Sequence, residues 1–184
     1  MDKDLILCLV GESGSGKTTV SRVLSEMGYN IIQSYTTREP REENEFGHIF
    51  VTEQEVPKLD NGEVDKSDMF AYTFFHNNHY WAQYEQYRGR GVTIYVIDPD
   101  GVIELLEKVR DARIEVVYLS VDEETRKQRM AQDRGESFAI ERIEHDREKF
   151  KALKDIIHWK INNDGTVAES VTALNYPISQ FVKN

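Results

Sequence analysis

The chain has 184 residues, 39% of them hydrophobic and 30% charged, with 11 glycines and 4 prolines. This length predicts one domain with a buried core, and the low glycine and proline content excludes a fibrous or disordered chain. The net charge of −10 argues against nucleic acid or an anionic membrane as a partner. The longest apolar run, residues 5–10, is far shorter than the ~20 residues of a membrane span, and no signal peptide is expected. The one cysteine, Cys8, excludes an internal disulfide and suits the reducing cytoplasm.

Strands and helices alternate along most of the chain, which predicts an α/β domain with a mostly parallel sheet flanked by helices. The first strand is expected at residues 5–10, followed by a glycine-rich turn and a helix over 17–27 that Gly28 ends. A segment rich in threonine, glutamate and aromatic residues, 34–75, interrupts the alternation. The other expected strands are 29–33, 48–51, 69–75, 92–97, 114–119 and 158–161, and the other expected helices are 102–109, 122–133, 138–155 and 167–174.

A glycine-rich string follows the first expected strand and fits the pattern G-x-x-x-x-G-K-[ST] in full. Glycines at these positions let successive backbone N–H groups point at phosphate oxygens, and the helix that follows adds its positive N-terminal end. The Lys17 ammonium can reach the β- and γ-phosphates, and the Thr18 hydroxyl can bind Mg²⁺. Because the string lies between an apolar strand and a helix, we predict nucleoside triphosphate binding rather than a chance turn. The expected contacts are Gly11, Ser13, Gly14, Ser15, Gly16, Lys17, Thr18 and Thr19.

Two arginines, Arg38 and Arg41, lie three residues apart on a threonine-rich segment after the second expected strand. Two guanidinium groups at this spacing can bind one phosphate dianion, with help from the Tyr80 hydroxyl. Alone, such a pair beside several glutamates is typical of solvated surface arginines. Next to a phosphate-binding loop, the pair favours a second anion site.

Residues 34–41 read SYTTREPR, and residues 47–51 read GHIFV. They resemble the signature of the guanylate kinase family, S-x-T-T-R-x-P-R followed by G-x-x-Y-x-F or close to it. The resemblance covers most of the chain, since residues 97–101, 134–142 and 161–164 resemble the family's I-D-x-Q-G segment, its lid and its late N-D segment. It implies a P-loop kinase fold, ATP and Mg²⁺ as cofactors, and a phosphorylated small molecule as acceptor.

The resemblance also implies roles for single residues. Lys17, Arg134 and Arg142 would be catalytic and face the transferred phosphoryl group, with Arg129 a further candidate. By contrast, Arg126 and Arg147 are expected to pair with acidic neighbours on exposed helix faces. The implied acceptor contacts are Ser34, Arg38, Arg41, Phe50, Tyr80 and Asp98, and Asn163 is implied to lie near the adenine. As a strand-end aspartate, Asp98 also fits a Walker B position or the cap of the next helix.

We expect one domain over residues 1–184 that consists of three parts. The core is expected at about 1–33 and 90–184. A small acceptor-binding subdomain is inserted at about 34–89, and a helical lid covers about 122–147. Within the insertion, the string Thr52-Glu53-Gln54-Glu55 predicts the start of a short helix through a capping box.

Base recognition departs from the family pattern. Phe50 stands at the family's acceptor-phosphate tyrosine, and Ala71 stands at the glutamate that reads guanine. Ala82 stands at a serine or threonine that meets the guanine carbonyl, and Trp81 replaces a glycine. Losing such buried hydrogen bonds weakens discrimination between bases. Candidate replacements are Asp68, Gln83 and Glu85. The aromatic residues between positions 72 and 87 form either a stacking wall for a base or the core of a small subdomain.

Three functions follow from these patterns. The first is ATP-dependent phosphoryl transfer to a nucleoside monophosphate, with GMP or dGMP by family default. The second is a kinase for another nucleotide or a ribose bisphosphate-like acceptor. The third is a non-catalytic guanylate kinase-like binding module, which the intact Lys17 and Thr18 disfavour. We expect a cytoplasmic monomer or homodimer.

Overall fold

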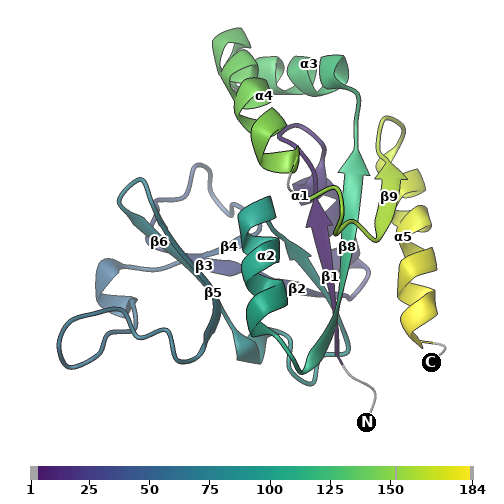
Figure 1. Cartoon of the computed structure of the whole chain (residues 1–184). Coiled ribbons are helices and arrows are strands. Elements are labelled where there is room, and N and C mark those ends of the chain that lie inside the picture. The colour runs from purple at the N-terminus through teal and green to yellow at the C-terminus, as the bar shows by residue number, and fades with distance from the viewer. Residues whose placement is uncertain (1–3, 152, 183–184) are drawn as a thin grey trace.

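A parallel sheet forms the centre of the protein in the computed structural model, which describes residues 4–151 and 153–182 (Figure 1). Its strand order is β2-β7-β1-β8-β9, and each neighbouring pair is parallel. The strands are β1 (Asp4–Val10), β2 (Asn30–Ile32), β7 (Val92–Val96), β8 (Ala112–Ser120) and β9 (Trp159–Asn162). The predicted α/β fold with a parallel sheet flanked by helices is confirmed.

Helices cover both faces of this sheet. α1 (Lys17–Glu26) and α5 (Val167–Val182) pack on one face, and α2 (Pro99–Lys108) packs on the other. The remaining helices are α3 (Glu123–Arg134) and α4 (Glu136–Lys151). Within β1, Leu7 and Leu9 pack in one hydrophobic cluster with residues of α1 and α5, whereas Ile6 and Cys8 pack in another with residues of α2. Both faces of β1 are therefore buried, which explains its continuous apolar run.

A second, smaller sheet lies to one side of the first and has the order β4-β3-β6-β5 (Figure 1). Its strands are β3 (Ser34–Thr36), β4 (His48–Phe50), β5 (Met69–Phe75) and β6 (Asn78–Gln83). β5 and β6 form a hairpin, whose turn residues His76 and Asn77 both have positive φ. Such a two-residue turn matches the twist of paired strands. Two 3₁₀ turns flank the hairpin, Glu53–Glu55 and Tyr84–Gln86, and the first carries the expected capping box at Thr52.

Four elements differ from the sequence-based expectation. The strand β3 was not expected, because it is only three residues long. The strand β6 was not expected, because its polar and aromatic residues show no clear alternation. α4 ends at Lys151 rather than at 155. α5 continues past residue 174 in spite of Pro177, because Ile178 is buried against the sheet. None of the helices in the described part of the chain has the length and hydropathy that crossing a bilayer requires.

The helices α3 and α4 form a hairpin above the carboxyl ends of β1 and β8 (Figure 1). Gly135, at a φ of 89°, separates them where the sequence predicted a break. Asp122 caps α3 by accepting a hydrogen bond from the Thr125 N–H. The hairpin and the second sheet thus lie beside the sheet edge where ligands of α/β proteins bind.

Candidate active site

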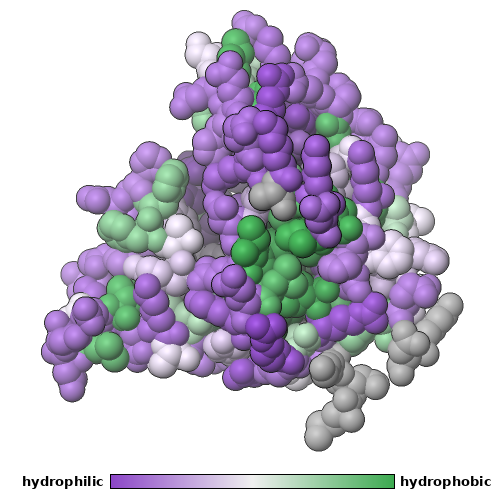
Figure 2. Space-filling model, viewed as in Figure 1, coloured by the Kyte–Doolittle hydropathy of each residue, from purple (hydrophilic) through white to green (hydrophobic). Residues whose placement is uncertain are grey.

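A cleft of about 600 Å³ lies between the loop after β1, the α3–α4 hairpin and the second sheet. Figure 2 shows a notch in the hydrophilic surface between these parts. Lys17 and Ser13 line one end of the cleft, and Ser34, His48 and Tyr80 line the other. The cavity therefore brings part of the predicted donor region together with Ser34, Tyr80 and Asp98 of the predicted acceptor region, whereas Arg38, Arg41 and Arg134 are not among the described residues that line it.

The loop from Gly11 to Gly16 connects β1 to α1 in a conformation that only glycine adopts easily. Gly14 and Gly16 have φ values of 79° and 86°. A Cβ atom on Gly14 would lie 2.9 Å from the Arg126 carbonyl oxygen, and one on Gly16 would lie 2.6 Å from Asn163 Nδ2. Since Gly16 has no side chain to cap α1, the first N–H groups of this helix remain available to an anion.

The Lys17 ammonium is held by this loop. Nζ donates hydrogen bonds to the Gly11 carbonyl at 2.6 Å and to the Glu12 carbonyl at 3.2 Å. Burial lowers the pKa of Lys17 to about 8, against the opposing effect of the Asp146 and Glu12 carboxylates. The ammonium is therefore positioned at the loop and responsive to nearby charge.

Arginines from the hairpin contact the same loop. Arg142 donates from Nη2 to Ser13 Oγ at 3.0 Å, and Arg129 donates from Nη1 to the Gly14 carbonyl at 3.2 Å. Arg126 was expected on an exposed helix face, and this was wrong: it is buried and donates to the Val121 carbonyl at 3.3 Å. Its Nη1 also donates to the Ser13 carbonyl of the loop at 3.5 Å.

The other two hairpin arginines do not reach the loop. Arg134 is exposed, pairs with Asp133 at 3.0 Å and lies over the Phe138 ring. Arg147 pairs with Glu123 at 2.7 Å, so it forms an exposed ion pair as expected. The two partners lie on different helices, α4 and α3, rather than on one helix. The structure thus brings Arg129 and Arg142, rather than Arg134, to the loop.

A carboxylate of the α3–α4 hairpin, Asp146, was missed in the sequence. Its Oδ2 accepts a hydrogen bond from the Ser13 N–H at 2.6 Å, and Arg142 Nη2 lies 3.7 Å from Oδ1. Burial alone would raise the pKa of Asp146, but the Ser13 N–H holds it below its usual value. An isolated aspartate on a charged helix carries no motif, so only the three-dimensional arrangement reveals this contact.

Asn163 fastens the loop from the opposite side. Its Nδ2 donates to the Ser15 carbonyl at 2.6 Å, and its Oδ1 accepts from Ser170 Oγ at 2.5 Å. Asn163 also lines a smaller cavity of about 240 Å³ together with Thr19 and Arg129. Thr18, the expected Mg²⁺ ligand, is exposed at the start of α1.

The two acceptor arginines share one carboxylate. Arg38 Nη2 pairs with Glu45 Oε1 at 2.7 Å, and the Arg41 backbone N–H donates to Glu45 Oε2 at 2.7 Å. Burial and the charges of Arg38 and Arg134 lower the pKa of Arg41. Arg41 is therefore surrounded mainly by positive charge, with Glu45 as the opposing carboxylate.

Phe50 lies beneath one of these arginines. The Arg38 guanidinium lies 5.3 Å from the centre of the Phe50 ring, and Phe50 is not among the described residues that line the cleft. Tyr80, by contrast, lines the cleft directly. Phe50 therefore supports an arginine, whereas Tyr80 faces the cavity.

Part of the cavity wall carries the groups suited to a base. Ser34 Oγ lies 3.2 Å from Tyr95 Oη, and Asp98 caps α2 by accepting from the Gly101 N–H at 2.8 Å. Ala71 lines the cavity, whereas Ala82 is fully buried in the core. The described carboxylates that line the cleft are Asp98, Asp100, Glu104 and Asp146, so Asp68 and Glu85 are not among them and neither is Gln83.

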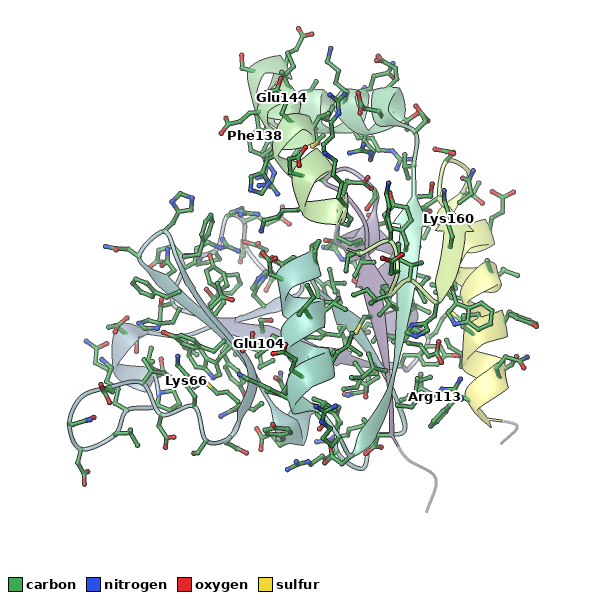
Figure 3. All side chains as sticks on the ribbon, viewed as in Figure 1. Lys66, Glu104, Arg113, Phe138, Glu144 and Lys160 are labelled. Carbon is green, nitrogen blue, oxygen red and sulfur yellow. The ribbon has the colours of Figure 1, made fainter. Side chains whose placement is uncertain are left out.

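Glu104 is the acidic group that sequence reasoning missed at this wall. It lies on the side of α2 that faces the second sheet (Figure 3). Lys108 pairs with it at 2.5 Å. Glu104 lies on a helix six residues after Asp98, whereas the family pattern places the base-reading carboxylate on a strand of the inserted segment.

Comparison with known proteins gives the family. A profile described as an AAA domain matches residues 7–151. The guanylate kinase of Wolbachia sp. subsp. Brugia malayi (strain TRS) is 30% identical over 174 residues, covering 89% of this chain and 86% of that protein. The guanylate kinase of Wolbachia pipientis wMel is 30% identical over 169 residues, covering 87% of this chain and 82% of that protein.

Solved structures share the fold. The crystal structure of guanylate kinase from Anaplasma phagocytophilum superposes with a TM-score of 0.60 at 20% identity. The match covers 98% of this chain and 87% of that chain. A gluconokinase from Sinorhizobium meliloti 1021 gives a TM-score of 0.53 at 15% identity, with coverage of 100% of this chain and 95% of that chain. With its glycine-rich loop, AAA-type match and curated relatives, this chain belongs to the guanylate kinase family.

Proposed function

We propose that the protein transfers the γ-phosphoryl group of ATP to the phosphate of a nucleoside monophosphate, with GMP or dGMP as the first acceptors to test. Family membership supports nucleotide kinase activity. The observation that carries the proposal is the single cleft, which has Lys17 and Ser13 at one end and Ser34 and Tyr80 at the other. Two anionic substrates bound at these ends would meet inside it.

The residues of the loop fit a triphosphate and Mg²⁺. Positions 14 and 16 leave no room for a Cβ atom, so the backbone can approach phosphate oxygens closely. The Thr18 hydroxyl would hold Mg²⁺ together with phosphate oxygens and water, as is usual for this ion. The metal would neutralise charge on the phosphates.

The chain's own groups would bind, orient and shield the reacting phosphates. Lys17 would exchange its bonds to loop carbonyls for phosphate oxygens, and Arg142 and Arg129 would bring positive charge from the hairpin. Arg38 and Arg41 would hold the acceptor phosphate. Phosphoryl transfer needs such positioning and charge stabilisation more than covalent chemistry from the protein. We propose that the hairpin is the lid, about 122–147, and that it excludes water on closing.

A different acceptor is the second candidate, because Ala71 lines the cavity where a base-reading carboxylate was expected. A sugar phosphate that carries no base would not need that carboxylate. A non-catalytic module is a weaker candidate, since the Lys17 contacts and the glycine geometry of the loop are intact. We propose the cytoplasm as the compartment, and either a monomer or a homodimer.

An acceptor panel tests the proposal. ADP release would be followed with ATP, Mg²⁺ and each of GMP, dGMP, AMP, CMP, UMP and ribose 5-phosphate, with the Lys17→Ala variant as the control. Turnover of a nucleoside monophosphate, abolished in the variant, is the expected result. Turnover of ribose 5-phosphate alone would favour the second candidate. Inactivity with the whole panel combined with no ATP binding would favour the binding module.

A further inference from the structure

All three polar groups of Ser13, in the glycine-rich loop, are hydrogen-bonded to the α3–α4 hairpin. The N–H donates to Asp146 Oδ2 at 2.6 Å, and Oγ accepts from Arg142 Nη2 at 3.0 Å. The carbonyl accepts from Arg126 Nη1 at 3.5 Å. The hairpin therefore fixes the loop at this residue, and Asp146 supplies the shortest of these bonds.

Asp146 is a buried carboxylate at the wall of the cleft. Its side chain is only 5% exposed. Buried carboxylates occur in proteins almost only where hydrogen bonds and positive charges compensate for the lost water. Here the Ser13 N–H binds Oδ2, while Oδ1 lies 3.7 Å from Arg142 Nη2 and 3.3 Å from His145 Nδ1. A single carboxylate thus joins the loop to the guanidinium that also contacts Ser13.

The face of α4 that carries Asp146 is anchored to the core. Arg142, Asp146 and Lys149 follow one another at spacings of four and three residues, so they lie on one side of the helix. Lys149 Nζ lies 3.1 Å from a carboxylate oxygen of Asp100 at the start of α2, and Phe150 packs on the hydrophobic core. Asp146 therefore lies between this anchor and Arg142, one helical turn from each.

The bond to Asp146 leaves the expected phosphate cradle free. α1 has no side-chain cap, so the N–H groups at its start, from Lys17 onward, remain available to an anion. Asp146 accepts from Ser13, four residues before this helix begins. Binding of a phosphate at the start of α1 is therefore compatible with retention of the Asp146 bond.

We propose that Asp146 is a positioning residue for phosphoryl transfer, which holds the Arg142 guanidinium at the glycine-rich loop, where the γ-phosphate of ATP binds. This inference rests on the proposed function and deepens it. Asp146 acts through Ser13 and Arg142 rather than by contact with the phosphates. A guanidinium fixed in this way needs little rearrangement when charge develops on the transferred group, and such preorganised charge accounts for much of the catalysis of phosphoryl transfer.

Two substitutions at Asp146 separate its charge from its hydrogen bond. Asp146→Asn keeps the shape and an oxygen that accepts from the Ser13 N–H, but it removes the charge that faces Arg142. Asp146→Ala removes both. Glu144→Gln is the matched control, because Glu144 is an exposed carboxylate two residues away on the same helix (Figure 3). Arg142→Ala and the double variant with Asp146→Ala complete a double-mutant cycle.

Kinetics and binding would be measured on the full chain. Initial rates with ATP, Mg²⁺ and GMP give kcat and both KM values, and calorimetry with ATP and with ADP, each with Mg²⁺, gives two dissociation constants. The ratio of these constants reports on the γ-phosphate, because the two nucleotides differ only in that group. Since the ratio needs no turnover, it tests the placement of Arg142 by Asp146 separately from the kinase activity.

We expect Asp146→Ala to lower kcat by about 10- to 100-fold, the cost of a misplaced catalytic group, with the GMP KM within about twofold of the wild type. ATP binding should weaken about three- to tenfold relative to ADP binding, because Arg142 is no longer held near the γ-phosphate. Asp146→Asn should show smaller losses of the same kind. In the Arg142→Ala background, Asp146→Ala should lower kcat by no more than about threefold. Glu144→Gln should match the wild type.

Three results would overturn the role of Asp146 and leave the kinase proposal standing. Tighter ATP binding in Asp146→Ala, with unchanged ADP binding, would mean that the carboxylate competes with the γ-phosphate. Equal kcat in the wild type and both Asp146 variants would show that the carboxylate positions nothing that the reaction needs. Additive losses in the double-mutant cycle would show that Asp146 does not act through Arg142.

The proposed function fails in a different way. A wild type that turns over no nucleoside monophosphate, while ATP binding still weakens relative to ADP binding in Asp146→Ala, would overturn the kinase proposal and leave the placement of Arg142 by Asp146 standing. A wild type that binds neither nucleotide would overturn both. Should Asp146→Ala fail to fold, the same comparisons apply to Asp146→Asn and its cycle with Arg142→Ala.

Discussion

In our proposal, the two ends of the cleft would bind phosphate in different ways. At the donor end, the backbone does most of the work: a glycine loop and the start of α1 present N–H groups, and Asn163 fastens the loop through the Ser15 carbonyl. At the proposed acceptor end, side chains would supply the contacts: Ser34 and Tyr80 line the cleft, and Arg38 lies nearby, paired with Glu45. One end depends on main-chain geometry and the other on residue identity.

This difference indicates which positions of the cleft tolerate substitution without a change of fold. Replacing a glycine of the donor loop would force backbone and side chains apart, because a Cβ atom has no room at Gly14 or Gly16. Replacing a side chain at the acceptor end alters one contact and leaves the strands in place. Ala71 is such a position, so the donor can stay constant while the acceptor varies.

Lys17→Ala should have the largest effect at the proposed donor end. Loss of the ammonium removes the main side-chain charge from the donor end, and we expect kcat to fall by about 10³-fold or more with the fold intact. Steady-state kinetics and circular dichroism would measure both. Lys127→Ala, which removes a partly exposed lysine paired with Glu136 on the hairpin, is the control. Activity within tenfold of the wild type in Lys17→Ala would exclude this donor site.

Arg41→Ala tests the acceptor end. Arg41 carries a charge that faces Arg38 and Arg134, and its loss should raise the acceptor KM about 10- to 100-fold, the range for hydrogen bonds to charged groups. The ATP KM should not change, because the donor loop is held separately. Arg90→Ala, an exposed arginine before β7 at the opposite edge of the sheet, should leave both constants unaltered. An equal rise in both KM values would mean that the two ends are not independent.

The pH profile of kcat/KM for ATP tests the charge state of Lys17 at the proposed donor end. The pKa of Lys17 is lowered to about 8 in the free protein, so its proton is lost as the pH rises above that value. Phosphate binding needs the charged form, and kcat/KM for ATP should therefore fall by up to about tenfold per pH unit above pH 8. Initial rates at low ATP between pH 6.5 and 10 measure this. A flat profile across that range would contradict the assigned role of the ammonium.

The sequence predicted the strand, glycine loop and helix at the start of the chain because this pattern depends on fixed spacing. A glycine loop between a buried strand and a helix leaves few alternatives, and the parallel sheet follows from the alternating elements. The acceptor strands β3 and β4 are only three residues long, so their pairing is set by the whole subdomain and not by a local pattern. This is why β3 was missed, whereas β6 was missed because its polar and aromatic residues show no clear alternation.

Single residues at the cleft were harder to find for the same reason. His48, Glu104 and Asp146 come from a short strand and two helices that are far apart in the chain, and each lacks a motif of its own. The prediction that Arg126 is exposed failed because an i,i+4 pattern of charges describes a single helix. It carries no information about other segments, here the glycine loop, that pack on that helix. Only the position of the loop under α3 shows that this arginine is buried.

Asn163→Ala tests how far the donor end depends on being fastened. The change removes the bond to the Ser15 carbonyl and leaves Ser170 Oγ without its Asn163 acceptor. We expect the free energy of unfolding to drop by about 1–3 kcal/mol, measured by urea titration. Asn61→Ala, in an exposed loop of the second sheet region, should change it by no more than about 0.5 kcal/mol. Equal stability of the two variants would show that the loop holds its shape without Asn163.

The smallest expected effect concerns base recognition at the acceptor end. Glu104 lines the cavity wall near Ala71 and Ser34, so its carboxylate is available to accept from a base N–H. Glu104→Gln keeps the size and removes the charge, and we expect the GMP KM to rise about two- to fivefold with ribose 5-phosphate binding unchanged. Glu107→Gln, on the exposed face of the same helix, is the matched control. A hydrogen bond to a base is separate from one to a phosphate, so Glu104→Gln should affect only acceptors that carry a base. An equal loss of ribose 5-phosphate binding would mean that Glu104 acts on the phosphate. The base and phosphate contacts at the acceptor end would then not be independent.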